Sequence, residues 1–102
     1  MKLLKKIKAL INYNIAIAKA KRLREETGVK QYVLSGEDGR LLVMTKNHFY
    51  KLRKRGVIDK SYKPRNLNSI AVWYTDGKDS RQMCNATAKK RKDKYINICT
   101  CL

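Results

Sequence analysis

The sequence predicts an α+β fold, and three observations lead to this prediction. Residues 2–27 carry apolar side chains at helical spacing and end before Gly28, which is typical of one long helix. After Gly28 the apolar pattern changes to period two on both sides of a glycine-containing turn, which is typical of a β-hairpin. A length of 102 residues with 43% hydrophobic content suffices for one modest core, so we expect a single domain over residues 1–102. The expected element order is α-β-β-α-β-β-β.

The first helix carries two apolar stripes. At about 100° per residue, the stripe that begins at Tyr13 is rotated well away from the one before Asn12. We expect the second stripe (Tyr13, Ala16, Ile17, Ala20 and Leu23) to dock on the protein's own sheet. The first stripe is then available to a partner, which makes residues 1–12 a candidate docking arm with the side chains Leu3, Leu4, Ile7, Leu10 and Ile11.

The hairpin and a short helix follow. Residues 29–35 and 40–45 are the expected strands, and Gly36, Asp38 and Gly39 supply the turn. Residues 46–55 are expected to form a basic helix, with Thr45 as N-cap and Gly56 closing it.

The last part of the chain is predicted to be mostly β. Residues 59–68 contain Pro64 and asparagines that favour a loop, and residues 69–75 give the clearest strand of the chain, followed by a turn at Asp76-Gly77. Residues 81–88 show no apolar period that supports a helix, and we interpret them as a strand. Residues 89–94 are expected to be an exposed basic turn. Residues 95–102 are the last expected strand, with Ile96, Ile98 and Leu102 on one face.

The charge is the most distinctive property of the chain. Its 25 Lys and Arg against 8 Asp and Glu leave a net charge of +17, which favours a nucleic acid, an acidic protein surface or an anionic membrane as partner. The alternative is a basic protein that has no polyanion partner. A membrane is disfavoured because no Trp or Phe anchors the first helix and no apolar run approaches a spanning length. Three acid-poor clusters are the candidate binding residues: Lys19 and Arg22; Lys46, Lys51, Arg53, Lys54 and Arg55; and Lys89, Lys90, Arg91 and Lys92.

These clusters favour phosphate or carboxylate contact over base reading. Asn47 is the one amide on the basic helix, and a hairpin stands where a helix-turn-helix needs its first helix. A solvated helix surface is the alternative for any one cluster. The tyrosines and Trp73 could stack on bases, but sheet or core packing is the more frequent role of such residues.

No constellation of residues predicts a reaction. His48 is the only histidine, and the eight acids are dispersed, so neither a paired-imidazole nor a paired-carboxylate mechanism is expected. The three cysteines, Cys84, Cys99 and Cys101, fit a reducing compartment and lack the paired spacing of a structural zinc site. We therefore expect no enzyme, no metal, no cofactor and no small-molecule substrate.

The segment "YVLSGEDGRLLVMTKNHFYKLRKRGVI" carries a resemblance. Here a hairpin leads through Val-Met-Thr-Lys into a basic helix that closes on Gly-Val-Ile. This unit, within residues 30–58, resembles a pattern in small basic proteins of the crAss-like tailed phages that infect gut Bacteroidetes. The resemblance implies a phage origin, in which a small basic protein decorates the capsid or binds DNA.

These observations give two hypotheses of function. The first is an auxiliary or minor capsid-associated protein, part of a multi-chain assembly, that binds an acidic capsid surface or packaged DNA. It is made in the host cytoplasm and located in the virion. The alternative is a free intracellular protein that binds DNA or RNA without sequence preference.

Overall fold

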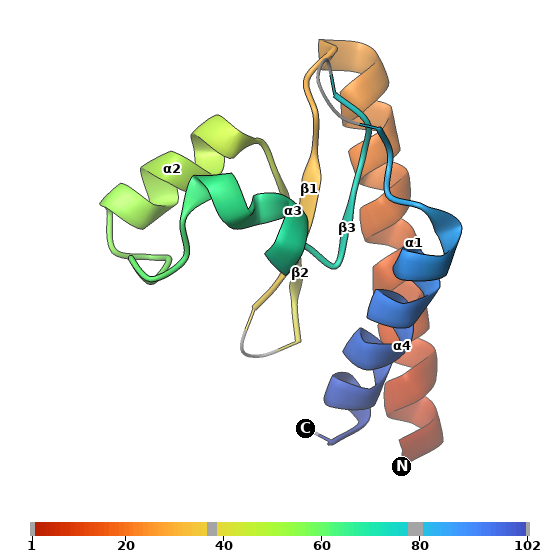
Figure 1. Cartoon of the computed structure of the whole chain (residues 1–102). Coiled ribbons are helices and arrows are strands. Elements are labelled where there is room, and N and C mark those ends of the chain that lie inside the picture. The colour runs from red at the N-terminus through yellow and green to blue at the C-terminus, as the bar shows by residue number, and fades with distance from the viewer. Residues whose placement is uncertain (1, 37–38, 78–80, 102) are drawn as a thin grey trace.

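The computed structural model describes residues 2–36, 39–77 and 81–101. Along the chain lie α1 (Lys2–Thr27), β1 (Tyr32–Ser35), β2 (Leu41–Met44), α2 (Lys46–Lys54), the 3₁₀ turn η1 (Pro64–Asn66), α3 (Leu67–Ile70), β3 (Trp73–Tyr74) and α4 (Asn85–Cys101) (Figure 1). The α+β class and the long N-terminal helix are confirmed. The element order of the last third differs from the prediction.

The three strands form one antiparallel sheet in the order β2-β1-β3. Tyr32 of β1 lies opposite Met44 of β2 and Tyr74 of β3, while Val33 lies opposite Val43 and Trp73. Because side chains alternate between the faces of a strand, the Tyr32 row and the Val33 row face opposite layers of the molecule. Figure 1 shows these layers, with α1 and α4 on one side of the sheet and α2 and α3 on the other.

Small side chains bring α1 close to the sheet. Ala16 and Ala20 are buried in one cluster with Val33, Trp73 and Met83. The second stripe therefore docks on the sheet, as predicted. Its first member, Tyr13, packs on α4 instead, in a cluster that contains Ala9, Val72, Tyr95 and Ile96.

The opposite face of the sheet is covered by α2 and α3. Tyr32 and Met44 from the sheet, Phe49 from α2, and Leu67 with Ala71 around α3 form one buried cluster. Phe49 is only 1% exposed, so it fixes the position of the whole basic helix. As predicted, α2 is capped by Thr45, whose hydroxyl accepts a hydrogen bond from the His48 amide (3.1 Å), and it is closed by Gly56 at φ +82°.

The prediction of strands within residues 81–101 was wrong, because Asn85–Cys101 is a single helix that runs antiparallel to α1 (Figure 1). Leu102, predicted at the end of the last strand, lies outside the described residues. Tyr95 and Ile96 are buried against α1, whereas Ile98 is half exposed. With partly buried Ala88 and Cys99, the buried positions follow a helical period, not the alternation that suggested a strand. The basic turn expected at residues 89–94 is the middle of this helix.

The segment before it also departs from the prediction. Residues 59–68, expected to be a loop, include η1 and the start of α3. Ser69 and Ile70, expected in a strand, belong to α3, so that only Trp73 and Tyr74 remain as the strand. The turn residues Asp38 and 78–80 lie outside the described residues.

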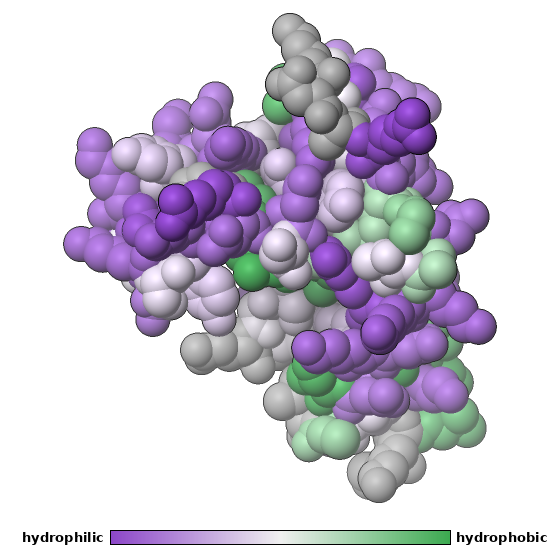
Figure 2. All heavy atoms as spheres, viewed as in Figure 1, coloured by the Kyte–Doolittle hydropathy of each residue, from purple (hydrophilic) through white to green (hydrophobic). Residues whose placement is uncertain are grey.

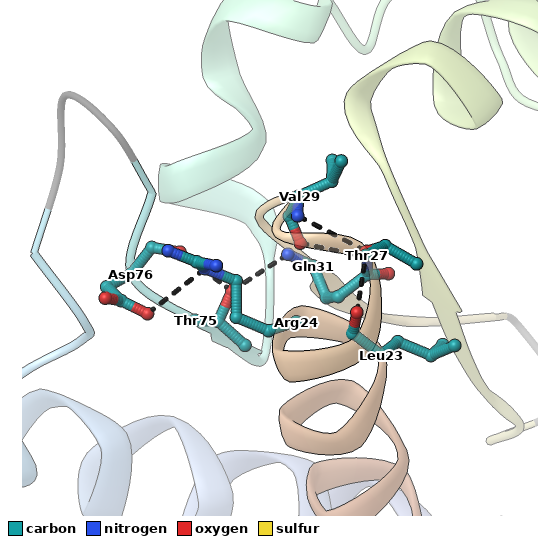
Figure 3. Close-up of polar contacts among 7 residues, drawn as sticks. All are labelled: Leu23, Arg24, Thr27, Val29, Gln31, Thr75 and Asp76. Atoms are coloured by element: carbon teal, nitrogen blue, oxygen red, sulfur yellow. Dashed lines mark hydrogen bonds and ion pairs between the residues drawn. The ribbon is translucent and has the colours of Figure 1, made fainter.

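Side-chain hydrogen bonds join the end of α1 to β1 and β3 (Figure 3). Gly28, at φ +71°, donates its amide to the carbonyl of Arg24 and ends the helix. The Arg24 Nε donates to the Asp76 carbonyl at 3.1 Å, and the Asp76 carboxylate lies 3.4 Å away. Buried Gln31 donates its backbone N–H to the Thr75 hydroxyl and its side-chain Nε2 to the Val29 carbonyl, so the polar groups of these two buried residues have partners.

Candidate functional site

The outer surface of α2 is strongly basic. Because Phe49 faces the core, Lys46, Lys51, Lys54 and Arg55 are left exposed. No acid lies within the helix, and basic residues in its last turn complement the negative end of the helix dipole. An exposed aromatic, Tyr50, is 56% accessible and stands four residues from both Lys46 and Lys54. Residues four apart share one helix face, so this row combines two cations with a free ring.

Arg53, one of the predicted binding residues, makes an internal contact. Its Nη2 and Nε donate to the Lys60 carbonyl at 2.7 and 3.3 Å, and the residue is half-buried. The guanidinium therefore holds the segment after α2 in place.

The cluster at residues 89–92 is divided by the helical geometry of α4. Lys89 and Lys90 are exposed, whereas Arg91 and Lys92 are half-buried. The Arg91 Nη1 donates to the carbonyls of Asn68 (2.7 Å) and Ala71 (2.8 Å). The Lys92 ammonium lies 5.2 Å from the centre of the Tyr13 ring, a favourable cation–π distance. Two of the four predicted binding residues thus make internal contacts.

The predicted cations of α1 lie on the other side of the sheet from α2 (Figure 1). Lys19 is exposed, and Arg22 forms a long ion pair with Glu26 (3.9 Å) in which both side chains are well exposed. Such a pair contributes little to stability. The predicted basic residues therefore lie on both sides of the sheet, those of α2 on one side and those of α1 and α4 on the other. Figure 2 shows hydrophilic side chains over α2 and over the middle of α4 in the face that it displays.

Lys30 is a cation that the sequence analysis did not single out. Its ammonium donates to the Asn68 side-chain carbonyl (2.7 Å) and lies 4.9 and 4.5 Å from the ring centres of Tyr32 and Tyr74. Burial lowers the pKa of Lys30, and the positive charge of Lys46 lowers this pKa further. The sequence around Lys30 does not predict this contact, because the rings of Tyr32 and Tyr74 come together beside it only through the pairing of β1 with β3.

The apolar face of α1 is largely exposed. Leu3, Leu4, Ile7 and Ile11 are 69%, 71%, 45% and 53% accessible, whereas Leu10 is partly buried against the Tyr13–Tyr95 cluster. Leu10 thus departs from the predicted stripe, because α4 covers its side of the helix. Ile15, 62% exposed, extends the stripe by another turn and was missed because it stands among residues of the second stripe. Residues 2–12 are continuous with the rest of α1, and Ala9 is buried.

The potentially reactive residues are scattered. His48 is exposed on α2 and Cys84 is exposed just before α4, while Cys99 is partly covered. Within residues 2–36, 39–77 and 81–101, no group of three or more His, Cys, Asp or Glu could hold a metal ion. The helices of the described chain are also too short or too polar to cross a membrane.

Comparison with known proteins gives no relative: no family model, no curated protein and no solved structure matches the chain.

Proposed function

We propose that the chain is a non-enzymatic protein that binds nucleic acid without sequence preference, through the outer surface of α2. The observation that carries this proposal is the row Lys46, Tyr50 and Lys54, in which an exposed ring lies between two exposed cations on a helix that lacks acids. Cations contact phosphates, and an exposed ring stacks on unpaired bases whatever their identity.

The charge balance supports the same proposal. Eight acids can neutralise at most eight of the 25 basic residues, and two ion pairs join described residues. A compact fold with this excess repels itself, and a polyanion relieves the repulsion. Because bound phosphates release condensed counterions, binding should weaken steeply as the salt concentration rises.

The test is titration of a fluorescent single-stranded DNA at several salt concentrations. Replacing Lys46, Lys51 and Lys54 with Gln should lower the slope of log affinity against log salt by about 2. Tyr50→Ala should weaken binding by about 1 to 3 kcal/mol, with little change in that slope.

The matched control replaces Lys5, Lys8 and Lys19 of α1 with Gln, which removes the same charge from a surface on the other side of the sheet. A control that lowers the slope as much as the α2 variant would show that the long-range charge, and not α2, determines binding. An unchanged slope in the α2 variant would refute the assignment.

We propose a second role, an auxiliary virion protein that docks on an acidic capsid surface, because the exposed face of α1 favours it. Five large aliphatic side chains in four turns are far more than a solvated helix requires. The resemblance to small basic phage proteins supports this role. Mass spectrometry of purified particles would test it, and the absence of the chain from intact virions would refute it. In particles that contain the chain, Ile7→Asp with Ile11→Asp should prevent incorporation while the protein stays folded.

A further inference from the structure

An apolar groove lies between the end of the hairpin and the connection from α2 to α3. Its volume is about 650 Å³, and its walls include Leu34 and Leu42 of the hairpin, Leu52 of α2, and Val57 and Ile58 after α2. Figure 2 shows apolar atoms in the hollow beside the part of the molecule that α2 forms. At its rim, Leu42 is 47% and Val57 69% exposed, so large aliphatic side chains face water where a partner could cover them.

The same groove borders a free strand edge. The hydrogen bond from the Gly36 amide to the Arg40 carbonyl sets the phase of the β1–β2 ladder. The direction of the backbone N–H and C=O groups alternates along a strand of an antiparallel pair. The N–H and C=O of Leu42 therefore point toward β1, and those of Leu41 and Val43 point away from β1. The edge position of β2 leaves these groups without a strand partner among the described residues. Leu42 therefore links the two features, with its side chain in the groove and its neighbours on the open edge.

The charge around the groove selects the kind of partner. Asp59 is among the described residues that line the groove, and no Lys or Arg is among them. The cations stand around it: residues 39–75, which contribute β2, α2 and the segment that includes β3, hold nine Lys or Arg and no acid besides Asp59. The Asp59 carboxylate accepts a hydrogen bond from the Ser61 amide (2.9 Å), which lowers the pKa of this carboxyl and holds it ionised. The acids of the hairpin turn, Glu37 and Asp38, lie outside the described residues. A segment with carboxylates beside its apolar residues complements this strongly basic surround.

We propose that the β2 edge and the groove together bind an extended apolar segment of a partner protein, flanked by Asp or Glu, as an added strand. Backbone hydrogen bonds to Leu41 and Val43 would hold the segment, and its alternate side chains would enter the groove beside Leu42. A second copy of this chain is a poor occupant because it brings a further +17 charge. The inference is independent of nucleic-acid binding, since it uses neither Tyr50 nor the exposed lysines of α2.

The experiment is selection of short randomised peptides displayed on a carrier, with the full chain as bait at about 0.15 M salt, where exposed charges are screened beyond about 8 Å. Counter-selection uses the double variant Leu42→Asp with Val57→Asp. Both positions are well exposed, so this variant should fold, which circular dichroism verifies. The matched control is Ile7→Asp with Ile11→Asp on α1, where exposure is similar and the charge change is the same.

Selected peptides should carry apolar residues at alternate positions together with Asp or Glu. They should bind the groove variant at least about tenfold more weakly than the α1 control, and N-methylation of alternate peptide amides should abolish binding because it removes strand hydrogen bonds. Three results would overturn the proposal: no peptide survives counter-selection, surviving peptides lack acids or alternate apolar residues, or N-methylated peptides bind as well as unmodified ones. Concentration-dependent dimers that the groove variant alone loses would identify a second copy as the occupant instead, which also overturns it.

Discussion

Arg91 was predicted to bind a partner, but its hydrogen bonds indicate a structural role, and replacing it should lower the stability of the fold. The Nη1 atom donates two hydrogen bonds to carbonyls at the end of α3, those of Asn68 and Ala71. The last carbonyls of a helix have no partner within the helix, so the guanidinium of α4 caps α3 from a distant part of the chain. Arg91→Lys keeps the charge, but the lysine side chain is one atom shorter, so its ammonium does not reach the position from which Nη1 contacts both carbonyls.

The expected loss follows from these two bonds. A hydrogen bond to a charged group contributes about 1.5 to 3 kcal/mol. Since Asn68 is exposed and water can replace its bond, we count mainly the bond to the buried residue Ala71 and expect about 2 kcal/mol for Arg91→Lys. For a domain of this size that is a fall of about 8 to 16 °C in Tm.

Urea unfolding followed by circular dichroism measures this difference. Lys90→Gln, on the exposed side of the same helix, is the control and should stay within about 0.5 kcal/mol of the original chain. A stability for Arg91→Lys that equals this control would show that the two hydrogen bonds contribute nothing, and would return Arg91 to the binding residues.

Two further predictions concern titrating side chains. The Thr87 hydroxyl, 3.0 Å from the Cys84 sulfur, lowers the pKa of this exposed thiol. Thr87→Val should therefore slow the alkylation of Cys84 by iodoacetamide near pH 8, because less thiolate is present. Peptide mass spectrometry measures the rate, and an unchanged rate would contradict this cause. Burial raises the pKa of Tyr13 above 10.0, so the stability that this tyrosine contributes is present below about pH 10 and is lost as the pH rises through its folded pKa. Tyr13→Phe should therefore weaken the fall of unfolding free energy between pH 9 and pH 11, and an equal fall in both chains would refute the assignment.

Local signals were sufficient for the first half of the chain. Gly28, Thr45 and Gly56 mark helix ends because the positive φ angles and the capping hydrogen bond act within a few residues. The hairpin register follows from a glycine turn between two alternating runs. For the same reason the basic helix was placed within one residue of its observed end.

The last helix could not be predicted in this way. Its buried or partly buried apolar residues, Ala88, Tyr95, Ile96 and Cys99, are separated by Arg91 and Lys92, whose charged ends contact neighbouring elements. A count of apolar residues treats these two positions as polar and loses the helical period. The short alternation at Ile96 and Ile98 then suggested a strand.

The sequence by itself determined the net charge of +17 and the first helix with its two apolar faces, because these depend only on which residues occur and how they are spaced. Only the tertiary structure decided which basic residues remain at the surface, since Arg53, Arg91 and Lys92 reach partners far along the chain or in another element. It also decided that Leu10 is covered while Ile15 is exposed, and that Leu42 lies both in an apolar groove and on a free strand edge. These properties arise from the packing of α4 on α1 and of α2 on the sheet. The residues that meet there are distant in sequence, so the shapes of the packed surfaces bring them together and no local sequence pattern predicts the contact.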